Sequence, residues 1–139
     1  MQETNRTFRI LLVDDDRDDC FLLQEALDRV APQTALTWLD DAGELWETMA
    51  DRMPGLIVLD YKLPKEDGIY WLHQLKAHPA YRHIPVVLWS TSSLKAIVAD
   101  AYRAGAQQYL EKPWEVTLLA DALQKIFKRF CSLPCSLSI

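Results

Sequence analysis

The chain has 139 residues, the length of one domain, and its composition, with half of the residues hydrophobic, is that of a globular protein able to bury an apolar core. A formal net charge of −5 disfavours direct binding to nucleic acid, whose phosphates the surface would repel. The three cysteines (Cys20, Cys131 and Cys135) follow no metal-binding spacing, the polar N-terminus carries no secretion signal, and no apolar run is long enough for a membrane span, so we expect a cytoplasmic protein with reduced thiols and no membrane segment.

Apolar runs and helical periods alternate along the chain. A predicted strand at 10–13 precedes a helical period at 23–30, a strand at 35–39 precedes one at 45–53, and a strand at 56–59 precedes one at 69–75. A strand at 86–89 then precedes a helical period at 94–101, which Gly105 ends, and a short strand at 109–110 precedes the longest apolar stripe, at 116–130. We interpret all of these helical stripes as core packing.

Strict alternation of strand and helix favours right-handed crossovers and a parallel sheet covered on both faces. The sequence therefore predicts an α/β fold, a doubly wound five-stranded parallel sheet of the (βα)5 type with strand order 2-1-3-4-5, which is flavodoxin-like. We expect an N-terminal extension at 1–7, the domain at 8–130 and a C-terminal tail at 131–139. Because this tail is too short for an output domain, we expect the chain to act through another protein.

Polar residues stand where the predicted strands end. Asp14 and Asp15 follow the first strand, Asp60 the third, Ser90 and Thr91 the fourth, and a lysine, Lys112, the fifth. Because ligand sites of open parallel sheets lie beyond the carboxyl ends of the strands, the three carboxylates should meet in one crevice. Carboxylates suit Mg²⁺ or Mn²⁺, and a lysine and a hydroxyl suit phosphate. These residues predict phosphoryl transfer to Asp60 as the nucleophile.

Three further aspartates belong to the same acidic cluster as Asp14 and Asp15. We interpret Asp18 and Asp19 as the acidic start of a helix, where they favour the positive end of the helix dipole, and Asp16 as its N-cap.

Four segments resemble the receiver domain of two-component response regulators, in particular stand-alone receivers of the chemotaxis-regulator type. They are residues 10–16, 59–68, 85–90 and 109–113, in the order and on the elements that the family pattern requires. The resemblance implies that Asp60 is the phosphoacceptor and that Asp14 and Asp15 hold Mg²⁺ with Asp60 and the backbone carbonyl of Lys62. It further implies that Lys112 pairs with the phosphoryl group and that a cis bond precedes Pro113.

The same resemblance implies a switch. Ser90 takes the position of the switch hydroxyl, for which Thr91 is the alternative, and Tyr109 takes that of the switch aromatic residue. Phosphorylation would then change the face of the fourth helix, fifth strand and fifth helix, through which a homodimer is plausible. The implied partners are a sensor histidine kinase or histidine phosphotransfer protein and a downstream protein target.

Two alternatives to a signalling receiver stay open at the level of sequence. One is a Mg²⁺-dependent phosphatase with an aspartyl nucleophile, although such enzymes carry the nucleophile after the first strand. The other is a receiver-like scaffold that is not phosphorylated. A receiver catalyses only its own phosphorylation and dephosphorylation and is otherwise not an enzyme. The Lys62 side chain can reach over the site, and we hypothesise that it alters the dephosphorylation rate.

Overall fold

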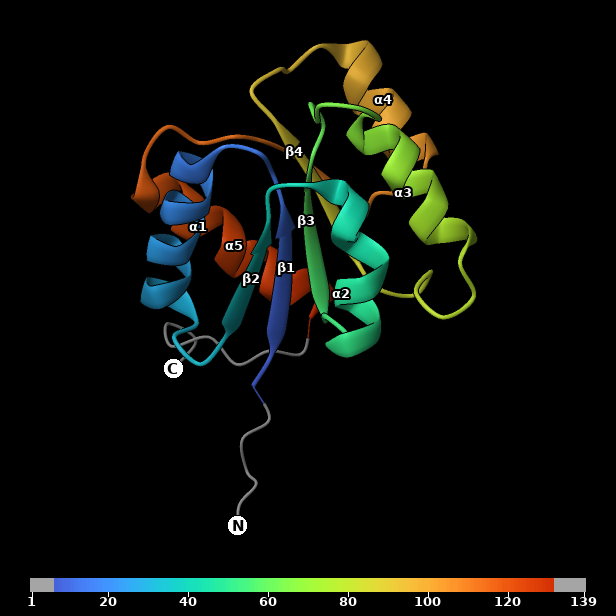
Figure 1. The fold of residues 1–139 in the computed structure, drawn as a ribbon. Coiled ribbons are helices and arrows are strands. Elements are labelled where there is room, and N and C mark those ends of the chain that lie inside the picture. The colour runs from blue at the N-terminus through green and yellow to red at the C-terminus, as the bar shows by residue number, and fades with distance from the viewer. Residues whose placement is uncertain (1–6, 132–139) are drawn as a thin grey trace.

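Five parallel strands form one sheet in the computed structural model, which describes residues 7–131 (Figure 1). The strands are β1 (Arg9–Val13), β2 (Ala35–Leu39), β3 (Leu56–Asp60), β4 (Val86–Ser90) and β5 (Gln108–Glu111). Their order is β2-β1-β3-β4-β5, so the predicted doubly wound fold and strand order are confirmed. The order reverses between β1 and β3, and the carboxyl ends of these two strands are therefore the place where a crevice opens.

The helices cover both faces of the sheet. α1 (Arg17–Val30) and α5 (Val116–Phe130) pack on one face, and α2 (Leu45–Asp51), α3 (Gly68–Ala77) and α4 (Lys95–Arg103) lie on the other (Figure 1). A short 3-10 helix, η2 (Ala42–Glu44), leads into α2. Among residues 7–131, no helix has the length and apolar character needed to cross a lipid bilayer.

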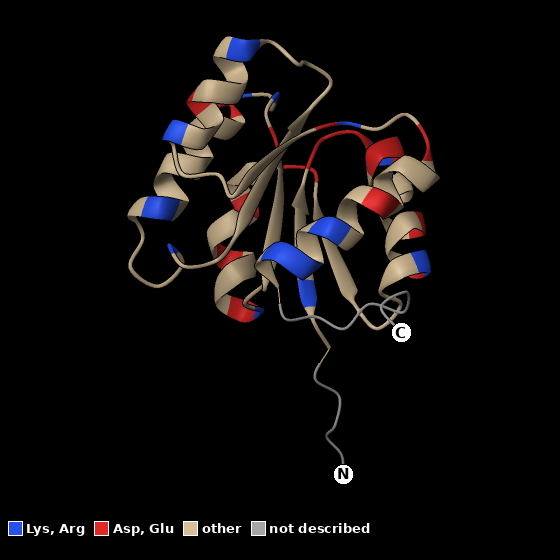
Figure 2. Cartoon of the chain, turned by 180° about the vertical axis from the view of Figure 1, so that it is seen from behind, with Lys and Arg blue, Asp and Glu red and all other residues tan. Residues whose placement is uncertain are grey.

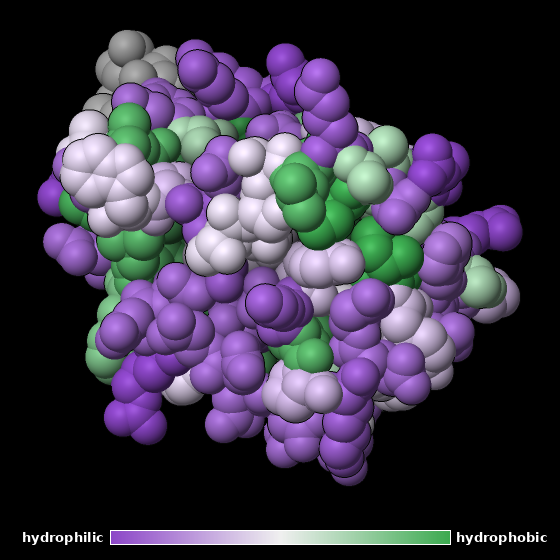
Figure 3. Space-filling model, turned by 90° about the horizontal axis from the view of Figure 1, so that it is seen from above, coloured by the Kyte–Doolittle hydropathy of each residue, from purple (hydrophilic) through white to green (hydrophobic). Residues whose placement is uncertain are grey.

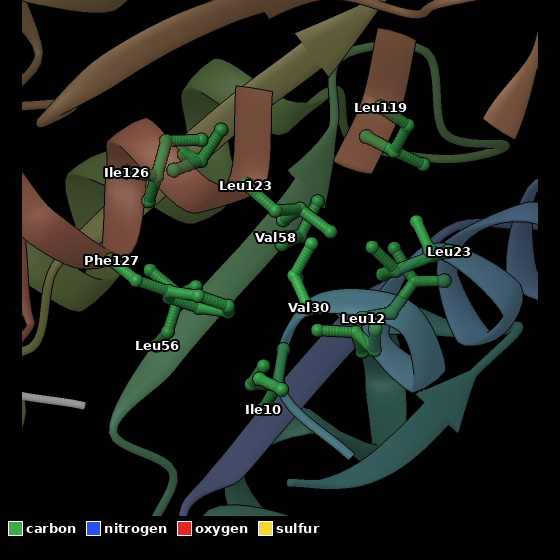
Figure 4. Packing of buried hydrophobic residues seen from close by; sticks show 14 of the residues in the cluster. Ile10, Leu12, Leu23, Val30, Leu56, Val58, Leu119, Leu123, Ile126 and Phe127 are labelled. Atoms are coloured by element: carbon green, nitrogen blue, oxygen red, sulfur yellow. The ribbon is translucent and has the colours of Figure 1, made fainter. Parts of the chain in front are cut away.

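Alternate strand residues supply two separate apolar clusters, one on each face. Those that meet α1 and α5 are Ile10, Leu12, Leu56, Val58, Val87 and Trp89. Figure 4 shows the strand side chains of this cluster pointing toward those of α1 and α5, which include Leu23, Val30, Leu119, Leu123, Ile126 and Phe127. The intervening strand residues pack against α2, α3 and α4. Because both faces are buried, the strands read as continuous hydrophobic runs in the sequence.

The helical stripe predicted at 94–101 is only partly a core stripe. Within α4 itself only Ala101 is buried, whereas Leu94 at the helix start is 66% exposed and Ile97 and Val98 are half-buried. The helix contacts the edge strand β5, which offers less apolar surface than a central strand. The interpretation of the whole stripe as core is therefore wrong, and the fourth helix presents apolar groups to solvent.

Helix boundaries were predicted less well than strands. α2 ends at Asp51, so Met53 lies beyond the helix and is exposed, although its spacing matched the helical period. Gly105 lies just past the end of α4 with φ of 107°, a conformation that favours glycine, as its predicted role as a helix stop requires.

The loop after β3 depends on a second glycine. Gly68, the first residue of α3, donates its N–H to the carbonyl of Tyr61 at 2.7 Å, and a Cβ placed on it would lie 2.4 Å from the carbonyl oxygen of Asp60. This approach brings the start of α3 against the end of β3. The loop that carries Lys62 is therefore folded back over the carboxyl end of the strand.

Candidate functional site

Three polar residues are buried among the described residues, and all three were predicted as site residues. Asp14 is 0% exposed, Asp60 is 3% exposed and Ser90 is 4% exposed. They lie at the carboxyl ends of β1, β3 and β4, with Asp60 and Ser90 being the last residues of their strands. Figure 2 shows acidic segments gathered at this edge of the sheet.

A crevice of about 380 Å³ opens at this edge. Among the residues that line it are six that the sequence assigned to the site, namely Asp15, Asp60, Lys62, Ser90, Thr91 and Lys112, whereas Asp14, Tyr109 and Pro113 are not part of its lining. The view onto the carboxyl edge shows a mainly hydrophilic surface with small separate groups of hydrophobic side chains (Figure 3). The crevice therefore opens onto a polar surface, as expected for a site that takes a charged ligand.

Three carboxylates at this edge of the sheet are placed to share a cation. One oxygen each of Asp14, Asp15 and Asp60 lies within 4.8 Å of the others, and Asp15 is exposed while the other two are buried. Oxygen ligands of this kind fit Mg²⁺ or Mn²⁺, and the exposed side leaves room for the waters that Mg²⁺ retains. The donor set thus fits the predicted cation. The predicted contribution of the Lys62 carbonyl stays a prediction.

Lys112, which directly follows β5, reaches two of these carboxylates. Its Nζ lies 3.1 Å from Asp14 Oδ2 and 3.3 Å from Asp60 Oδ1, and its backbone N–H donates to the carbonyl of Ser90 at 2.7 Å. No peptide bond among the described residues is cis, so the predicted cis bond before Pro113 is wrong. The pairing of Lys112 with the end of β4 already directs its side chain into the crevice, and a trans bond suffices for this.

A fourth carboxylate, that of Asp19, also belongs to the site. Its Oδ2 accepts from Lys112 Nζ at 2.7 Å, which is shorter than the contacts of this ammonium with Asp14 and Asp60. The interpretation of Asp19 as only an acidic helix start is therefore incomplete. A side chain in the first turn of α1 leans toward the helix N-terminus and hence toward the strand ends, which is the signal that could have identified it. Asp16 is the N-cap, as predicted, and accepts from the N–H of Asp18.

Burial governs the electrostatics of the site. Loss of solvation raises the pKa of Asp14 to about 7, even though the N–H of Asp16 and the charge of Lys112 favour the carboxylate. Burial likewise raises the pKa of Asp60. Burial alone would lower the pKa of Lys112, but the hydrogen bond to Asp19 and the charges of Asp14 and Asp60 outweigh it and raise that pKa. One ammonium thus faces an excess of negative charge, which favours binding of a further cation.

Two tryptophans hold Asp14 from opposite sides, and sequence reasoning had not connected either of them with this residue. Trp89 donates its indole N–H to Asp14 Oδ2 at 3.0 Å, and Trp38 donates its own to the Asp14 backbone carbonyl at 2.6 Å. Lys112 Nζ also lies 5.4 Å from the centre of the Trp89 ring. The sequence signal was the position of Trp89 within a buried strand, because a buried indole N–H needs an acceptor.

The two predicted switch residues are joined through Ser92. Ser90 Oγ accepts from the N–H of Ser92 at 3.1 Å, and the Tyr109 hydroxyl donates to the carbonyl of Ser92. The N–H of Tyr109 in turn donates to the hydroxyl oxygen of Tyr102 at 3.0 Å, which ties β5 to α4. Of the two candidate hydroxyl residues, Ser90 is buried and Thr91 is exposed, and both line the crevice.

The chain is similar to a known domain family and to curated proteins. The sequence profile of the response regulator receiver domain matches residues 10–124. The probable methanogenesis regulatory protein FilR2 of Methanothrix harundinacea is 32% identical over 130 residues, which cover 89% of this chain and 84% of that protein. The response regulator GraR of Staphylococcus aureus is 28% identical over 121 residues, covering 87% of this chain, and the chain spans about half (52%) of the length of GraR.

Two solved structures resemble the fold closely. The phosphorylated cyanobacterial phytochrome response regulator RcpA superimposes with a TM-score of 0.79 and 28% identity, covering 91% of this chain and 95% of RcpA. The Mn²⁺-bound form of response regulator Rcp1 superimposes with a TM-score of 0.76 and 31% identity, covering 91% of this chain and 99% of Rcp1.

Proposed function

The chain belongs to the response regulator receiver domain family, and on this premise we propose that it accepts a phosphoryl group on Asp60 and passes the signal to a protein partner. One observation carries the proposal: Asp60, the last residue of β3, is buried beside the carboxylates of Asp14 and Asp15, which follow β1, and its Oδ1 lies 3.3 Å from Lys112 Nζ. The sheet order reverses between β1 and β3. Apart from its own phosphorylation and dephosphorylation, the protein is a signalling protein rather than an enzyme.

The proposed reaction is transfer of a phosphoryl group to the Asp60 carboxylate, which acts as the nucleophile in its ionised form. An oxygen of Asp60 bonds to phosphorus while the bond from phosphorus to the donor nitrogen or oxygen breaks, and the donor keeps that electron pair. Lys112 lies close enough to stabilise the negative charge on the phosphoryl oxygens, and its contact with Asp60 holds it there beforehand.

Asp14, Asp15 and Asp60 are the residues that would hold Mg²⁺ or Mn²⁺. When bound, the cation would neutralise charge on the carboxylates and the phosphoryl oxygens. Mn²⁺ in the Rcp1 structure, a receiver of the same fold, supports this proposal. Lys112 would exchange part of its contact with Asp19 for the phosphoryl group, and its strong preference for the charged form suits that role.

Ser90 and Tyr109 are proposed to transmit the change. A phosphoryl group on Asp60 offers the Ser90 hydroxyl a new acceptor, and movement of that hydroxyl releases the N–H of Ser92. The carbonyl of Ser92 accepts from Tyr109, so the loop and the aromatic ring move together. Exposed apolar side chains support a protein-contact face that is altered by this movement: Leu94 directly before α4, Tyr102 on α4 and Leu118 on α5.

The proposed phosphoryl donor is a phosphohistidine of a sensor histidine kinase or a histidine phosphotransfer protein, as in two-component signalling. Two partners are proposed for the exposed face of α4, β5 and α5. One is a different protein, and the alternative is a second copy of this chain, which would form a homodimer. A cytoplasmic location and the influence of Lys62 on the phosphoryl lifetime both stay predictions.

Incubation with acetyl phosphate and Mg²⁺, followed by intact mass measurement, tests the proposal. The protein should gain one phosphate, and Asp60→Asn should gain none. Asp67→Asn is the matched control: Asp67 caps α3 in the same loop and asparagine also caps helices, so this variant should be phosphorylated normally. An adduct that persists in Asp60→Asn would contradict the proposal, and steady turnover of a phosphomonoester would favour the phosphatase alternative.

A further inference from the structure

Trp89 places a hydrogen-bond donor inside the acidic site. It lies in β4 directly before Ser90, is 1% exposed, and points to the face of the sheet that α1 and α5 cover. Its indole N–H donates at 3.0 Å to Oδ2 of Asp14, which is itself fully buried. The hydrogen bond spans 75 residues of sequence and is formed away from solvent, so its two partners cannot exchange it for water without local opening.

Three donors fix the plane of the Asp14 carboxylate. Oδ1 accepts from the backbone N–H of Asp16 at 2.8 Å, and Oδ2 accepts from Trp89 and lies 3.1 Å from Lys112 Nζ. An ionised carboxylate offers about four lone-pair sites to donors, and these three donors occupy three of them. The carboxylate is thus held from both oxygens, and one of its oxygens lies within 4.8 Å of an oxygen each of Asp15 and Asp60.

The three donors differ in whether they would stay in place when Asp60 is phosphorylated. Under the proposed function Lys112 turns toward the phosphoryl group, and the N–H of Asp16 belongs to the same loop as the carboxylate that it holds. Trp89 is the donor that sits on a central strand, paired with β3 on one side and β5 on the other. It therefore keeps the carboxylate in place when Lys112 moves.

We propose that Trp89 is a positioning residue for the divalent cation, and that its indole N–H sets the affinity of the site by holding the Asp14 carboxylate. The inference rests on the proposed function, since it concerns a metal ligand of the same site. Hydrogen bonds to metal-ligating groups commonly change metal affinity by ten- to a hundredfold when they are removed.

Trp38 supplies a matched control within the same chain. Its indole N–H also donates to Asp14, at 2.6 Å, but to the backbone carbonyl rather than to the carboxylate. It belongs to β2, on the other side of β1 from β3. Trp38→Phe removes a hydrogen bond to the same residue, and we expect it to leave the orientation of the carboxylate unchanged, because all three donors to the carboxylate remain.

The test measures Mn²⁺ binding by electron paramagnetic resonance, which counts the free ion and requires no phosphorylation. Trp89→Phe should bind Mn²⁺ about ten- to a hundredfold more weakly than the wild type, and Trp38→Phe should stay within about twofold of it. Phosphorylation by acetyl phosphate should need more Mg²⁺ in Trp89→Phe but reach the wild-type rate at saturation. A purely structural role would instead lower the saturated rate.

The possible results distinguish the cation site from the role of Trp89. If the wild-type protein binds no Mn²⁺, both the proposed cation site and this inference are wrong. If Trp89→Phe binds Mn²⁺ as tightly as the wild type, or if Trp38→Phe weakens binding as much as Trp89→Phe does, the inference alone is wrong. Circular dichroism shows whether Trp89→Phe folds. If it does not, NMR of the wild-type protein follows the assigned indole N–H signal of Trp89 while Mg²⁺ is added. A shift of that signal with slower hydrogen exchange is expected, and an unchanged signal would reject the proposal.

Discussion

At the scale of single residues, Asp14 combines complete burial with a carboxyl group that has other acidic neighbours. Burial raises its pKa to about 7, while the hydrogen bond from Asp16 and the charge of Lys112 act in the opposite direction. The ionised form of this carboxyl group can bind a cation, but without a cation it destabilises the folded state. Replacing the carboxyl group with a neutral group is therefore expected to stabilise the metal-free fold.

The sign of this effect can be measured through pH. Between about pH 4 and pH 7 folded Asp14 holds a proton that the unfolded chain has lost, so its contribution to the free energy of unfolding falls as the pH rises, by at most about 1.4 kcal/mol per pH unit. Above pH 7 both states are ionised and the slope ends. In EDTA, Asp14→Asn should gain stability over the wild type as the pH rises from 4 to 7, measured by urea unfolding at several pH values.

Asp121→Asn is the control for this experiment, because Asp121 is exposed on α5. Its difference from the wild type should change little across the same pH range. If the stability difference between Asp14→Asn and the wild type shrinks toward pH 7, the raised pKa of Asp14 is contradicted.

At the scale of elements, the end of β3 and the start of α3 are held together by the absence of a side chain at Gly68. A Cβ there would lie 2.4 Å from the Asp60 carbonyl oxygen and 2.9 Å from both Leu88 Cδ1 and Tyr61 Cα. Two of these three atoms belong to the backbone at the end of β3, one in Asp60, the proposed phosphoacceptor, and one in Tyr61, which follows it. The distance between α3 and β3 is therefore coupled to the position of Asp60.

Gly68→Ala should lower the free energy of unfolding by roughly 1–3 kcal/mol, although alanine is the better helix former, because the backbone must shift to admit the methyl group. The same shift should slow phosphorylation by acetyl phosphate. Gly43→Ala is the comparison: its Cβ would meet Asp41 Oδ1 at 3.2 Å, an exposed side chain that can move. Urea unfolding that ranks Gly43→Ala as the more destabilised variant would refute this reasoning.

At the scale of the whole molecule, the site lies on the edge where two separate cores meet. β1, β3 and β4 each contribute side chains to both cores and end in a site residue or are followed by one. A cation bound at these strand ends would contact only the folded state, since Asp14, Asp15 and Asp60 are brought together by the sheet. The free energy of cation binding is therefore added to the free energy of unfolding of the entire domain.

Mg²⁺ at a hundred times its dissociation constant should therefore raise the free energy of unfolding by about 2.7 kcal/mol. Asp15→Asn should lose most of this gain, because it removes an exposed ligand without disturbing the core. Asp16→Asn should retain the gain, since asparagine preserves the N-cap of α1. Thermal unfolding with and without Mg²⁺ measures both, and equal stabilisation of the two variants would exclude Asp15 as a ligand.

Much of the molecule could be predicted from its sequence. Continuous apolar runs located the strands, their alternation with helical periods implied a doubly wound sheet, and strand-end positions selected Asp14, Asp60, Ser90 and Lys112 as neighbours. These features follow from local patterns and from the general geometry of parallel sheets. The sequence by itself therefore determined the fold, the family and the residues that converge.

The tertiary structure alone decided how these residues are held. The contact of Asp19 with Lys112 joins positions 93 residues apart, and the bond of Trp89 to Asp14 joins positions 75 apart. Only the structure revealed the trans bond before Pro113 and the exposed face of α4. The physical reason is the same in each case. A hydrogen-bond partner depends on the reach of a side chain across packed elements, and burial depends on which neighbours cover it, whereas a local sequence pattern specifies only the conformation and facing of its own segment.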